Sequence, residues 1–372
     1  MNLWNTVRLS EVIELQRGHD LPVQARQPGV VPVLGSNGIV GFHDDAPYTG
    51  PGVTIGRSGV IGGATYTLGP YWPLNTCLFV KDFKGNDSRW VYYWLKSTDF
   101  SSMDSGSAQP SLNRNYIAGL PVSLPPVPEQ KAIADILGAL DDKIDNNNQL
   151  ALTTEHLGAA KFKLTGLDTE PTDAGVLLDE LFALNPRRVL ESETPTVIDM
   201  QALPTTTPLV GSWNTGVRKG GARFANGDTL IARITPCLEN RKTAFIDFLG
   251  EGEVGIGSTE FIVMRSKNNL PLGLSYFMAT SARFRDFAIQ NLVGTSGRQR
   301  VSAADLARHT LSPIDPSELQ SFGEWADANL SLLGAIRNEN QVLKTTRDTL
   351  LPRLMSGKLR VKDAEALVES VV

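Results

Sequence analysis

The side chains that most often carry catalysis do not form an active-site motif in this sequence. The four histidines, His19, His43, His156 and His309, lack the spacing of metal ligands, so no metal site is predicted. The glycine-rich stretch 56–63 lacks the Gly-Lys-Ser/Thr ending of a nucleotide-binding loop. Asn185-Pro186-Arg187-Arg188 comes nearest to a methyltransferase Asn/Asp-Pro-Pro-aromatic loop, but arginines do not suit a base-stacking pocket. No catalytic residue is therefore predicted.

Polar loop residues instead favour a binding function. Such loops supply the donors and acceptors that read base edges, with Arg suited to guanine and Asn or Gln to adenine. The candidate DNA-binding residues of the first half are Asn37, Arg57, Ser58, Gln109, Asn113 and Arg114. Those of the second half are Asn214, Arg218, Lys219, Arg233, Arg241, Lys242, Arg298, Gln299 and Arg300. Taken alone, each of these residues is equally compatible with being an ordinary exposed loop residue. The 298–300 patch is favoured because it stands where the Gln109 loop stands in the first half.

The charge distribution bears on whether nucleic acid is the partner. The net charge of −5 argues against it at first, because phosphate contacts need Lys and Arg. However, residues 1–127 hold 9 basic and 9 acidic side chains, and residues 176–317 hold 15 and 14. The acidic excess lies elsewhere, with 4 basic and 8 acidic residues in 128–170. The overall charge is therefore a weak test of DNA binding.

Anchor sequences recur in the same order in the two halves, which predicts an internal repeat. Residues 8–12 match 177–181, 52–55 match 227–230, and 76–80 match 259–263, while Leu112 stands opposite Val301. Each half is rich in Gly, Pro, Thr and Val, with short apolar runs typical of strands. These runs are 30–33, 53–55, 78–80, 229–234 and 261–264. Short helices are predicted over 88–96 and 272–289.

Each half then closes with apolar residues at helical spacing. The first long helix begins near residues 128–130, and the second begins near 316–318 with Ser317 as the predicted N-cap. Their apolar stripes cannot stay exposed, so the two helices are expected to pair as a coiled coil. The predicted interface residues are Ile133, Leu137, Leu140, Ile144, Phe322, Leu333, Ile336, Leu343 and Leu350.

Three consecutive asparagines, 146–148, interrupt the stripe of the first helix. One interpretation is a solvated or kinked turn. The other is that Asn147, opposite or near Asn340, fixes the register of the helix pair, as a buried asparagine does in coiled coils. The sequence leaves both open.

These features predict an α+β protein with two strand-rich mixed domains separated by two long helices, arranged as an internal repeat. The expected domains are 1–127, the helix 128–170, 171–317, and the helix and tail 318–372. Cys77 and Cys237 are far apart and lack zinc-site spacing, so no disulfide framework is expected. No secretion signal or run of about 18 apolar residues occurs, which favours a cytoplasmic location.

Several sequence motifs, taken in their order along the chain, resemble those of the specificity subunits of type I restriction-modification systems. Gly-Ser-Asn-Gly at 35–38 precedes Val-Thr-Ile-Gly-Arg-Ser-Gly at 53–59, and Gly-Ser-Ala-Gln-Pro-Ser-Leu-Asn follows at 106–113. A segment rich in Leu and Pro, residues 120–130, precedes the first long helix. The last motif is Leu-Leu-Pro-Arg-Leu-Met-Ser-Gly-Lys-Leu at 350–359. The second half departs at 231–233, where Ile-Ala-Arg replaces the Ile-Gly-Arg of 55–57. This departure limits which contacts can be transferred from the family.

The resemblance implies two target-recognition domains, each reading one half of a split, asymmetric site in double-stranded DNA, joined by an antiparallel coiled coil. It also implies two docked modification (methyltransferase) subunits that bind S-adenosylmethionine, and restriction subunits that use ATP and Mg²⁺. The chain itself would hold no cofactor and catalyse nothing. Two rival interpretations are a free-standing DNA-binding regulator, which would dock no methyltransferase, and an adhesive or scaffolding protein, which would bind no duplex.

Overall fold

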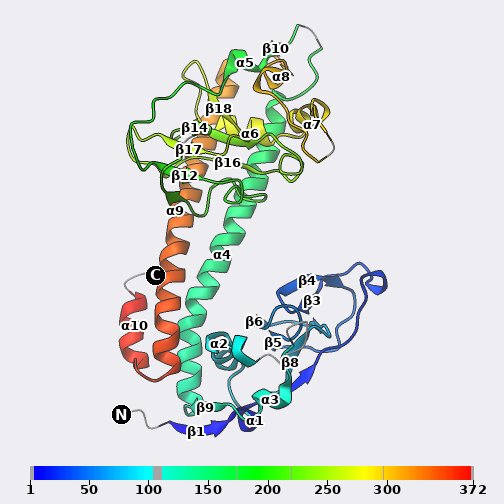
Figure 1. The fold of residues 1–372 in the computed structure, drawn as a ribbon, viewed down its shortest axis with the longest axis vertical. Coiled ribbons are helices and arrows are strands. Elements are labelled where there is room, and N and C mark those ends of the chain that lie inside the picture. The colour runs from blue at the N-terminus through cyan, green and yellow to red at the C-terminus, as the bar shows by residue number, and fades with distance from the viewer. Residues whose placement is uncertain (1–3, 104–110, 173, 219, 296, 370–372) are drawn as a thin grey trace. The chain divides into compact units, whose positions relative to one another are not determined.

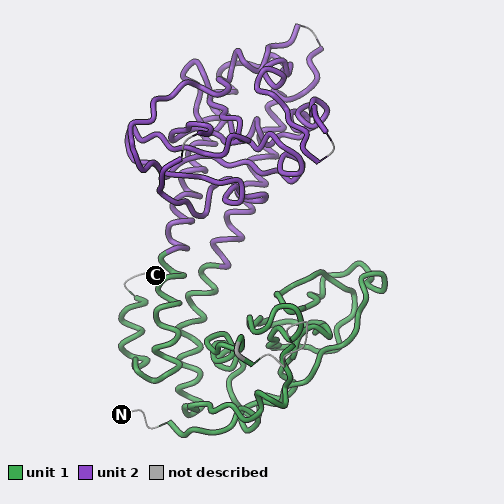
Figure 2. The backbone as a smooth tube through the Cα atoms, viewed as in Figure 1, with its two compact units in different colours: residues 1–144, 342–372 green, residues 145–341 purple. Residues whose placement is uncertain are grey.

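The computed structural model describes residues 4–103, 111–172, 174–218, 220–295 and 297–369 (Figure 1). The chain divides into two compact units, residues 1–144 with 342–372 (unit 1) and residues 145–341 (unit 2), which Figure 2 distinguishes by colour. Both long helices contribute to both units, because the divisions fall inside them. None of the helices in the described ranges has the length and apolar character needed to cross a membrane.

Unit 1 begins with three small sheets. β1 (Asn5–Arg8) pairs with β9 (Pro121–Leu124) in antiparallel fashion. A four-stranded sheet has the order β2 (Glu14–Arg17), β8 (Cys77–Asp82), β5 (Gly52–Gly56), β6 (Gly62–Thr67). A three-stranded sheet has the order β4 (Gly38–His43), β3 (Val31–Gly35), β7 (Trp72–Pro73). β5 is buried along its whole length, as its β-branched residues favour.

Short helices connect and cover these strands. They are α1 (Leu9–Val12), the 3-10 turns η1 (Val23–Ala25) and η2 (Ser101–Met103), α2 (Ser88–Ser97) and α3 (Arg114–Ile117). The predicted helix over 88–96 is therefore present as α2. Asp87 caps it, because its side chain accepts a hydrogen bond from the Trp90 amide at 2.8 Å. Trp90 and Tyr93 of α2 are fully buried in the core of unit 1.

Unit 2 repeats this plan. β10 (Val176–Leu177) pairs with β19 (Thr310–Leu311). One four-stranded sheet has the order β11 (Phe182–Leu184), β18 (Phe261–Ser266), β15 (Thr229–Ala232), β16 (Thr243–Phe245). The other has the order β13 (Asn214–Thr215), β12 (Thr196–Ile198), β17 (Gly255–Gly257), β14 (Arg223–Phe224). The short helices are α5 (Leu178–Leu181), α6 (Leu274–Thr280), α7 (Ala282–Gln290) and α8 (Ala303–Leu306).

Backbone hydrogen bonds confirm the internal repeat. The Leu112 amide donates to the Arg57 carbonyl at 2.8 Å, and the matching Val301 amide donates to the Arg233 carbonyl at 3.0 Å. The strand order β2-β8-β5-β6 of unit 1 returns as β11-β18-β15-β16 in unit 2. The two halves, which share local sequence patterns, therefore have the same strand order in this sheet.

The strand register corrects one detail of the sequence alignment. Ile55 stands opposite Leu78 in unit 1, and Ile231 stands opposite Ile262 in unit 2. Because Ile55 and Ile231 both lie two residues before an equivalent arginine, Leu78 corresponds to Ile262. The alignment of 52–55 with 227–230 and of 76–80 with 259–263 instead pairs Ile55 with Leu230 and Leu78 with Phe261, each one residue away. Apolar residues occur at both positions, so the sequence pattern alone could not choose between them.

The helix predicted over 272–289 is wrong as a single element. It is two helices, α6 and α7, separated at Ser281, whose ψ of 150° is extended rather than helical. The Ser281 hydroxyl donates to the Met278 carbonyl at 2.7 Å, which satisfies an acceptor at the end of α6. Helical spacing persists through the break, and so the apolar pattern concealed it.

The first long helix is α4 (Val127–Thr165). Its start is held by Gln130, which is 1% exposed. The Gln130 side chain donates to the Pro125 carbonyl at 2.9 Å and to Asn86 Oδ1 at 2.8 Å, and it accepts from the Asp87 amide at 3.0 Å. Pro128 lies in the first turn, where a missing N–H costs nothing. The proline-rich phrase thus ties the helix to the domain before it.

The second long helix is α9 (Pro316–Met355), followed by α10 (Val361–Glu369). The expected N-cap, Ser317, is wrong, because Asp315 precedes the helix and its side chain accepts from the Ser317 amide at 2.8 Å. Asp315 also accepts from the Ser317 hydroxyl at 2.6 Å. Pro316 therefore occupies the first helical position, where proline is favoured.

α4 and α9 pair antiparallel within each unit. In unit 1, Arg347 of α9 donates to Asp141 of α4 at 2.6 Å. In unit 2, the rings of Phe162 and Phe322 lie 5.4 Å apart. Residue numbers rise along one helix as they fall along the other. All nine residues of the predicted helix interface are buried, six of them in the core of unit 1 and three, Phe322, Leu333 and Ile336, in the core of unit 2.

The asparagine run contacts the opposite helix. Asn147 is 6% exposed and donates to Asn340 Oδ1 at 3.0 Å and to Glu339 Oε2 at 2.7 Å. Asn340, 7% exposed, donates in turn to Asn148 Oδ1 at 3.1 Å. α4 continues through all three asparagines. This arrangement supports the register interpretation over that of a turn.

Replacing Asn147 with leucine is expected to destabilise unit 2 by about 1–3 kcal/mol, because the Asn340 amide would remain buried with a lost partner. The double variant Asn147→Leu/Asn340→Leu should recover much of that loss, since both polar groups are then gone. Thermal melts of the two single variants and the double variant, compared as a double-mutant cycle, measure the coupling. A single variant that melts at the wild-type temperature would contradict a register role.

Candidate nucleic-acid interface

A polar cleft of about 700 Å³ lies at the edge of the four-stranded sheet of unit 1. It is formed by the end of β2, the start of β8, and the segments that carry Arg57 and Asn113. Three of the six candidates in this half, Arg57, Asn113 and Arg114, line it. Two other basic residues of this cleft, Arg17 and Lys81, were not predicted from the sequence. We call this group of residues the unit 1 cleft.

Arg57 is held at the base of the unit 1 cleft by its own backbone. Its amide donates to the Thr76 carbonyl at 2.9 Å, and its guanidinium donates to the Asn75 carbonyl at 3.2 Å. The preceding Gly56 is required, because a Cβ there would lie 2.3 Å from the Val60 carbonyl oxygen. The half-buried guanidinium keeps further donors available, and no described carboxylate forms an ion pair with it.

The other cations of the unit 1 cleft have weak, exchangeable partners. Lys81 pairs with Glu14 at 3.0 Å and Arg17 with Asp20 at 3.4 Å, with all four side chains about half or more exposed. Exposed pairs of this kind contribute only about 0–1 kcal/mol, so a phosphate can replace the carboxylate at little cost. Asn113 caps α3, accepting from the Asn115 amide at 2.9 Å, which leaves its amide group free to donate.

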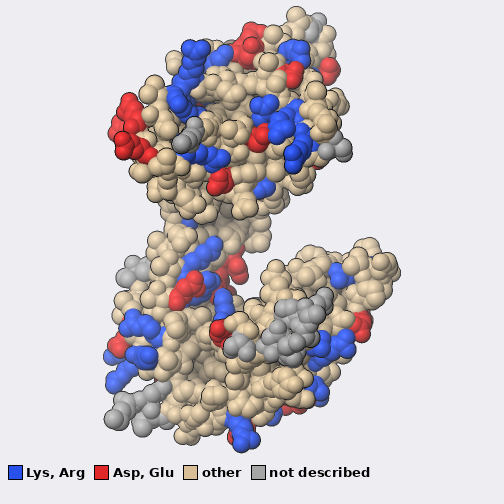
Figure 3. Space-filling model, in the orientation of Figure 1, with Lys and Arg blue, Asp and Glu red and all other residues tan. Residues whose placement is uncertain are grey.

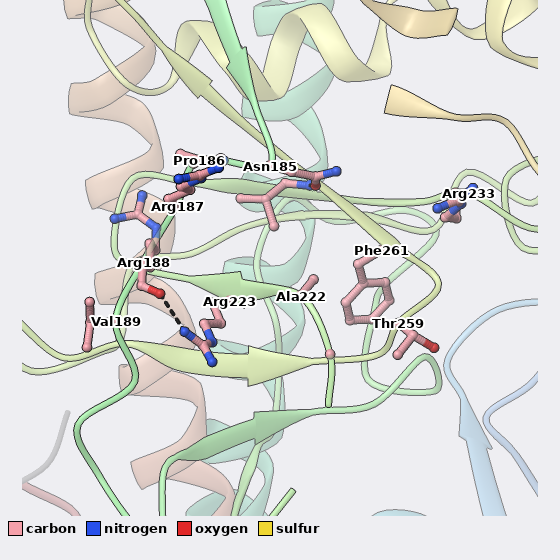
Figure 4. Close-up of a pocket in the computed structure, with 12 residues that line it drawn as sticks. Asn185, Pro186, Arg187, Arg188, Val189, Ala222, Arg223, Arg233, Thr259 and Phe261 are labelled. Carbon is pink, nitrogen blue, oxygen red and sulfur yellow. Dashed lines mark hydrogen bonds between the residues drawn. The ribbon is translucent and has the colours of Figure 1, made fainter. Parts of the chain in front are cut away.

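A second cleft, of about 670 Å³, lies in unit 2 (Figure 4). Its basic residues are Arg187, Arg188, Arg223 and Arg233. Arg187 is exposed and has no hydrogen-bond or ion-pair partner within the described part of the chain. Arg188 donates to the fully buried Asp228 at 2.6 Å, while its carbonyl accepts from Arg223 at 2.7 Å, the dashed line in Figure 4. We call this group the unit 2 cleft.

Arg233 stands at the opposite end of the unit 2 cleft from Arg188, as Figure 4 shows. Its amide donates to the Glu260 carbonyl at 3.0 Å, so its backbone is fixed to the start of β18. Its Nε is buried and has no hydrogen-bond partner among the described residues. A buried donor without a partner is costly, which suits a group that is completed by a ligand.

The two clefts occupy equivalent places in the repeat. Arg57 follows β5 and Arg233 follows β15, the third strands of matching sheets. Arg17 ends β2, and Arg187 and Arg188 follow β11, the edge strands of the same sheets. Arg187 and Arg188 were visible in the sequence but were compared only with a methyltransferase loop. Strand pairing, which places them in the same cleft as Arg233, was the missing signal.

The 298–300 patch is divided by the structure. Arg300 makes a bidentate contact with Glu260, Nη2 to Oε1 at 2.8 Å and Nε to Oε2 at 2.9 Å. This hydrogen bond lowers the pKa of the Glu260 carboxyl, so the pair stays charged at neutral pH. The Gln299 backbone exchanges hydrogen bonds with Thr235, whereas Arg298 is exposed. Arg300 therefore orders the loop, and Arg298 remains available to a ligand.

The remaining candidates that the structure describes do not line either cleft. Asn37 is exposed in the turn between β3 and β4, and Ser58 forms a bridge with Ser111. Asn214 is exposed in β13, whereas Arg218 pairs with Asp199 at 2.6 Å. Lys242 donates to the Met200 carbonyl at 2.7 Å, and Arg241 lines a separate pocket. Gln109 and Lys219 lie outside the described residues.

Charge is mixed over both units. On the face that Figure 3 shows, Lys and Arg are interspersed with Asp and Glu instead of forming one continuous basic surface. Attraction for a polyanion is therefore local to clefts such as these two. Within the described ranges, no group of three or more His, Cys, Asp or Glu is arranged to hold a metal ion.

Comparison with known proteins finds a family that the first part of the chain resembles. Residues 1–155 match the family model described as type I restriction modification DNA specificity domain. This part of the chain is therefore similar to the specificity domains of type I restriction-modification systems. The fold of the chain is similar to the crystal structure of the type I restriction-modification S subunit from M. genitalium, with a TM-score of 0.64 and 16% identity over 94% of this chain and 96% of that one.

Two curated relatives align with parts of this chain. The type I restriction enzyme EcoAI specificity subunit of Escherichia coli is 38% identical over 87 residues, which is 23% of this chain and 14% of the relative. The EcoEI specificity subunit of the same organism is 27% identical over 157 residues, 41% of this chain and 26% of the relative. The aligned segments thus span well under two thirds of these relatives.

Proposed function

We propose that this chain recognises a bipartite sequence in double-stranded DNA, and that residues 1–127 and 171–317 are two target-recognition domains, each reading one half. The observation that carries the proposal is the basic cleft at the same place in both units, with Arg57 and Arg233 in equivalent positions. Arginine recognises guanine in bidentate fashion and also binds phosphate. The different side chains around the two arginines suit two different half-sites.

Catalysis is assigned to partners. The matched relatives are specificity subunits of type I restriction enzymes, and arginines line both clefts. We infer that the helices 128–170 and 318–372 dock two methyltransferase subunits, which bind S-adenosylmethionine, and that restriction subunits join through the complex. The acidic excess of 128–170 keeps this helix segment unattractive to DNA and open to protein partners.

The long helices also set the distance between half-sites in this proposal. The chain passes between the units at two points, between Ile144 and Asp145 and between Gln341 and Val342, and both lie inside long helices. A continuous helix has a constant rise per residue, about 1.5 Å, so helix length translates into spacer length.

Binding to duplex DNA at several salt concentrations tests the proposed function. Fluorescence anisotropy of the chain, alone and with co-purified methyltransferase subunits, should show affinity that falls by about a thousandfold or more between 50 and 200 mM salt, because many phosphates are neutralised. Mapping methylated adenines in the source genome should reveal two half-sites and one spacer. Salt-independent behaviour without duplex binding would favour a scaffolding protein instead.

A further inference from the structure

A small pocket of about 230 Å³ lies within unit 2, and none of its residues lines the unit 2 cleft. It lies among the second half of α4, the helices α6 and α7, and the turn that precedes β16. Glu155 and His156 come from α4, Tyr276 from α6, Arg285 from α7, and Arg241 from the turn. Its volume falls below the range typical of drug-sized ligand sites, so it suits a small ligand.

Two arginines in this pocket have no carboxylate partner. Arg285 is 8% exposed, and its guanidinium donates to the Leu238 and Glu239 carbonyls at 3.4 and 3.3 Å, both long contacts. Neither Arg285 nor Arg241 forms an ion pair with any residue that the structure describes. A buried charge is usually paired, because desolvation of an isolated ion is costly.

The one carboxylate that lines the pocket is hydrogen-bonded to a tyrosine. Glu155 accepts a hydrogen bond from the Tyr276 hydroxyl at 2.9 Å, and burial raises the pKa of the Glu155 carboxyl, while the nearby Arg241 acts in the opposite direction. Burial lowers the pKa of Arg285, and so does the charge of Arg241, whereas Asp286 acts in the opposite direction. Arg241 adopts a left-handed backbone conformation with φ of 62°, which is uncommon for residues other than glycine. The pocket thus retains an unbalanced positive charge.

Unit 1 contains another tyrosine–carboxylate pair, at a different position of the repeat. The Tyr93 hydroxyl of α2 donates to Asp141 of α4 at 2.7 Å. There, Arg347 pairs with the same carboxylate at 2.6 Å and Lys96 lies 3.9 Å from it. In that network the carboxylate has ion-pair partners, whereas Glu155 of unit 2 has none within the described residues. In unit 2, the two cations instead line a cavity.

We propose that this pocket of unit 2 binds a phosphate group between Arg241 and Arg285. Two guanidinium groups match the geometry of a tetrahedral oxyanion, because each can donate two parallel hydrogen bonds. The loop Thr205-Thr206-Thr207 at the mouth of the pocket offers hydroxyl donors for the remaining oxygens. The phosphate is either a free anion or belongs to a DNA backbone, and both sources satisfy the same chemistry.

Isothermal titration of the full-length chain with inorganic phosphate, against chloride at constant ionic strength, tests the proposal. Phosphate should bind and raise the melting temperature of the wild-type chain. Arg241→Gln and Arg285→Gln should each weaken phosphate binding about tenfold or more, since each removes a charged donor. Arg308→Gln, an exposed arginine of the same unit paired with Asp305, should leave phosphate binding unchanged.

The source of the phosphate is distinguished by adding duplex DNA. Undisturbed phosphate binding at saturating DNA indicates a free anion, whereas competition, with weaker DNA binding by Arg241→Gln, indicates a backbone phosphate. The proposal is overturned if the wild-type chain shows no response to phosphate. It is also overturned if Arg241→Gln, whose exposed side chain should not disturb folding, retains wild-type phosphate affinity.

Discussion

Inserting one heptad into each long helix, after Ile144 in α4 and after Gln341 in α9, is expected to widen the spacer of the recognised DNA site by up to about three base pairs. Seven residues add about 10.5 Å of helix, and successive base pairs are about 3.4 Å apart. A heptad also preserves the apolar stripe of the helix pair, so the two helices can still bury it. Both half-site sequences should stay unchanged, because the clefts are untouched.

Methylation mapping of cells that carry the lengthened chain, together with its methyltransferase subunits, measures the new spacer directly. The matched control inserts the same heptad into α4 alone. This single insertion takes the asparagine pair Asn147–Asn340 and the ion pair Asp141–Arg347 out of mutual register, so DNA recognition should be lost. A doubly lengthened chain that still methylates the original spacing would show that the helices do not set it.

Replacing Arg57 or Arg233 with alanine is expected to weaken DNA binding by about tenfold or more and to relax sequence discrimination in one half-site only. Loss of a bidentate arginine–guanine contact costs about 1–3 kcal/mol. Each side chain sits in its own cleft, so Arg57→Ala should affect one half-site and Arg233→Ala the other. The backbone bonds that these residues make are unaffected by the change.

Oligonucleotides with single substitutions in each half-site measure the discrimination of each variant. Arg308→Ala is a matched control, because Arg308 is exposed and pairs with Asp305 within its own turn. If a variant loses DNA affinity equally for all sequences, and the slope of its salt dependence falls by about one, the arginine contacts a backbone phosphate instead of a base. Unchanged affinity in both variants would remove the clefts from the interface.

Periodicity and local chemistry made much of the architecture predictable. α4 and α9 were predictable because apolar residues recur at 3/4 spacing over many turns, and burial of that stripe is the only stable outcome. The strands β5, β8, β15 and β18 were predictable from short β-branched runs. At Ser281, between α6 and α7, the apolar spacing fits one long helix as well as two short ones, and the prediction of a single helix was wrong.

The candidate site was predictable only in part. Arg57 and Arg233 were predicted as polar loop residues that follow strands, and the structure places each of them in a cleft. Arg300 was assigned to base reading, yet it is bound by Glu260, a residue 40 positions away in the sequence. Partners at such separation are chosen by strand pairing, which loop composition does not reveal.

The sequence by itself determined that this protein has two related strand-rich halves and two long helices, because these depend on hydrophobic period and on repeated local phrases. Only the tertiary structure decided which polar residues share a cleft. Strand pairing places Arg187, Arg188 and Arg223 in the same cleft as Arg233, and it places Arg241 in a separate pocket with Arg285. Pairing between strands that are distant in the sequence decides this arrangement of arginines. The physical reason is that the partners and burial of a charged side chain depend on the residues that the fold places around it.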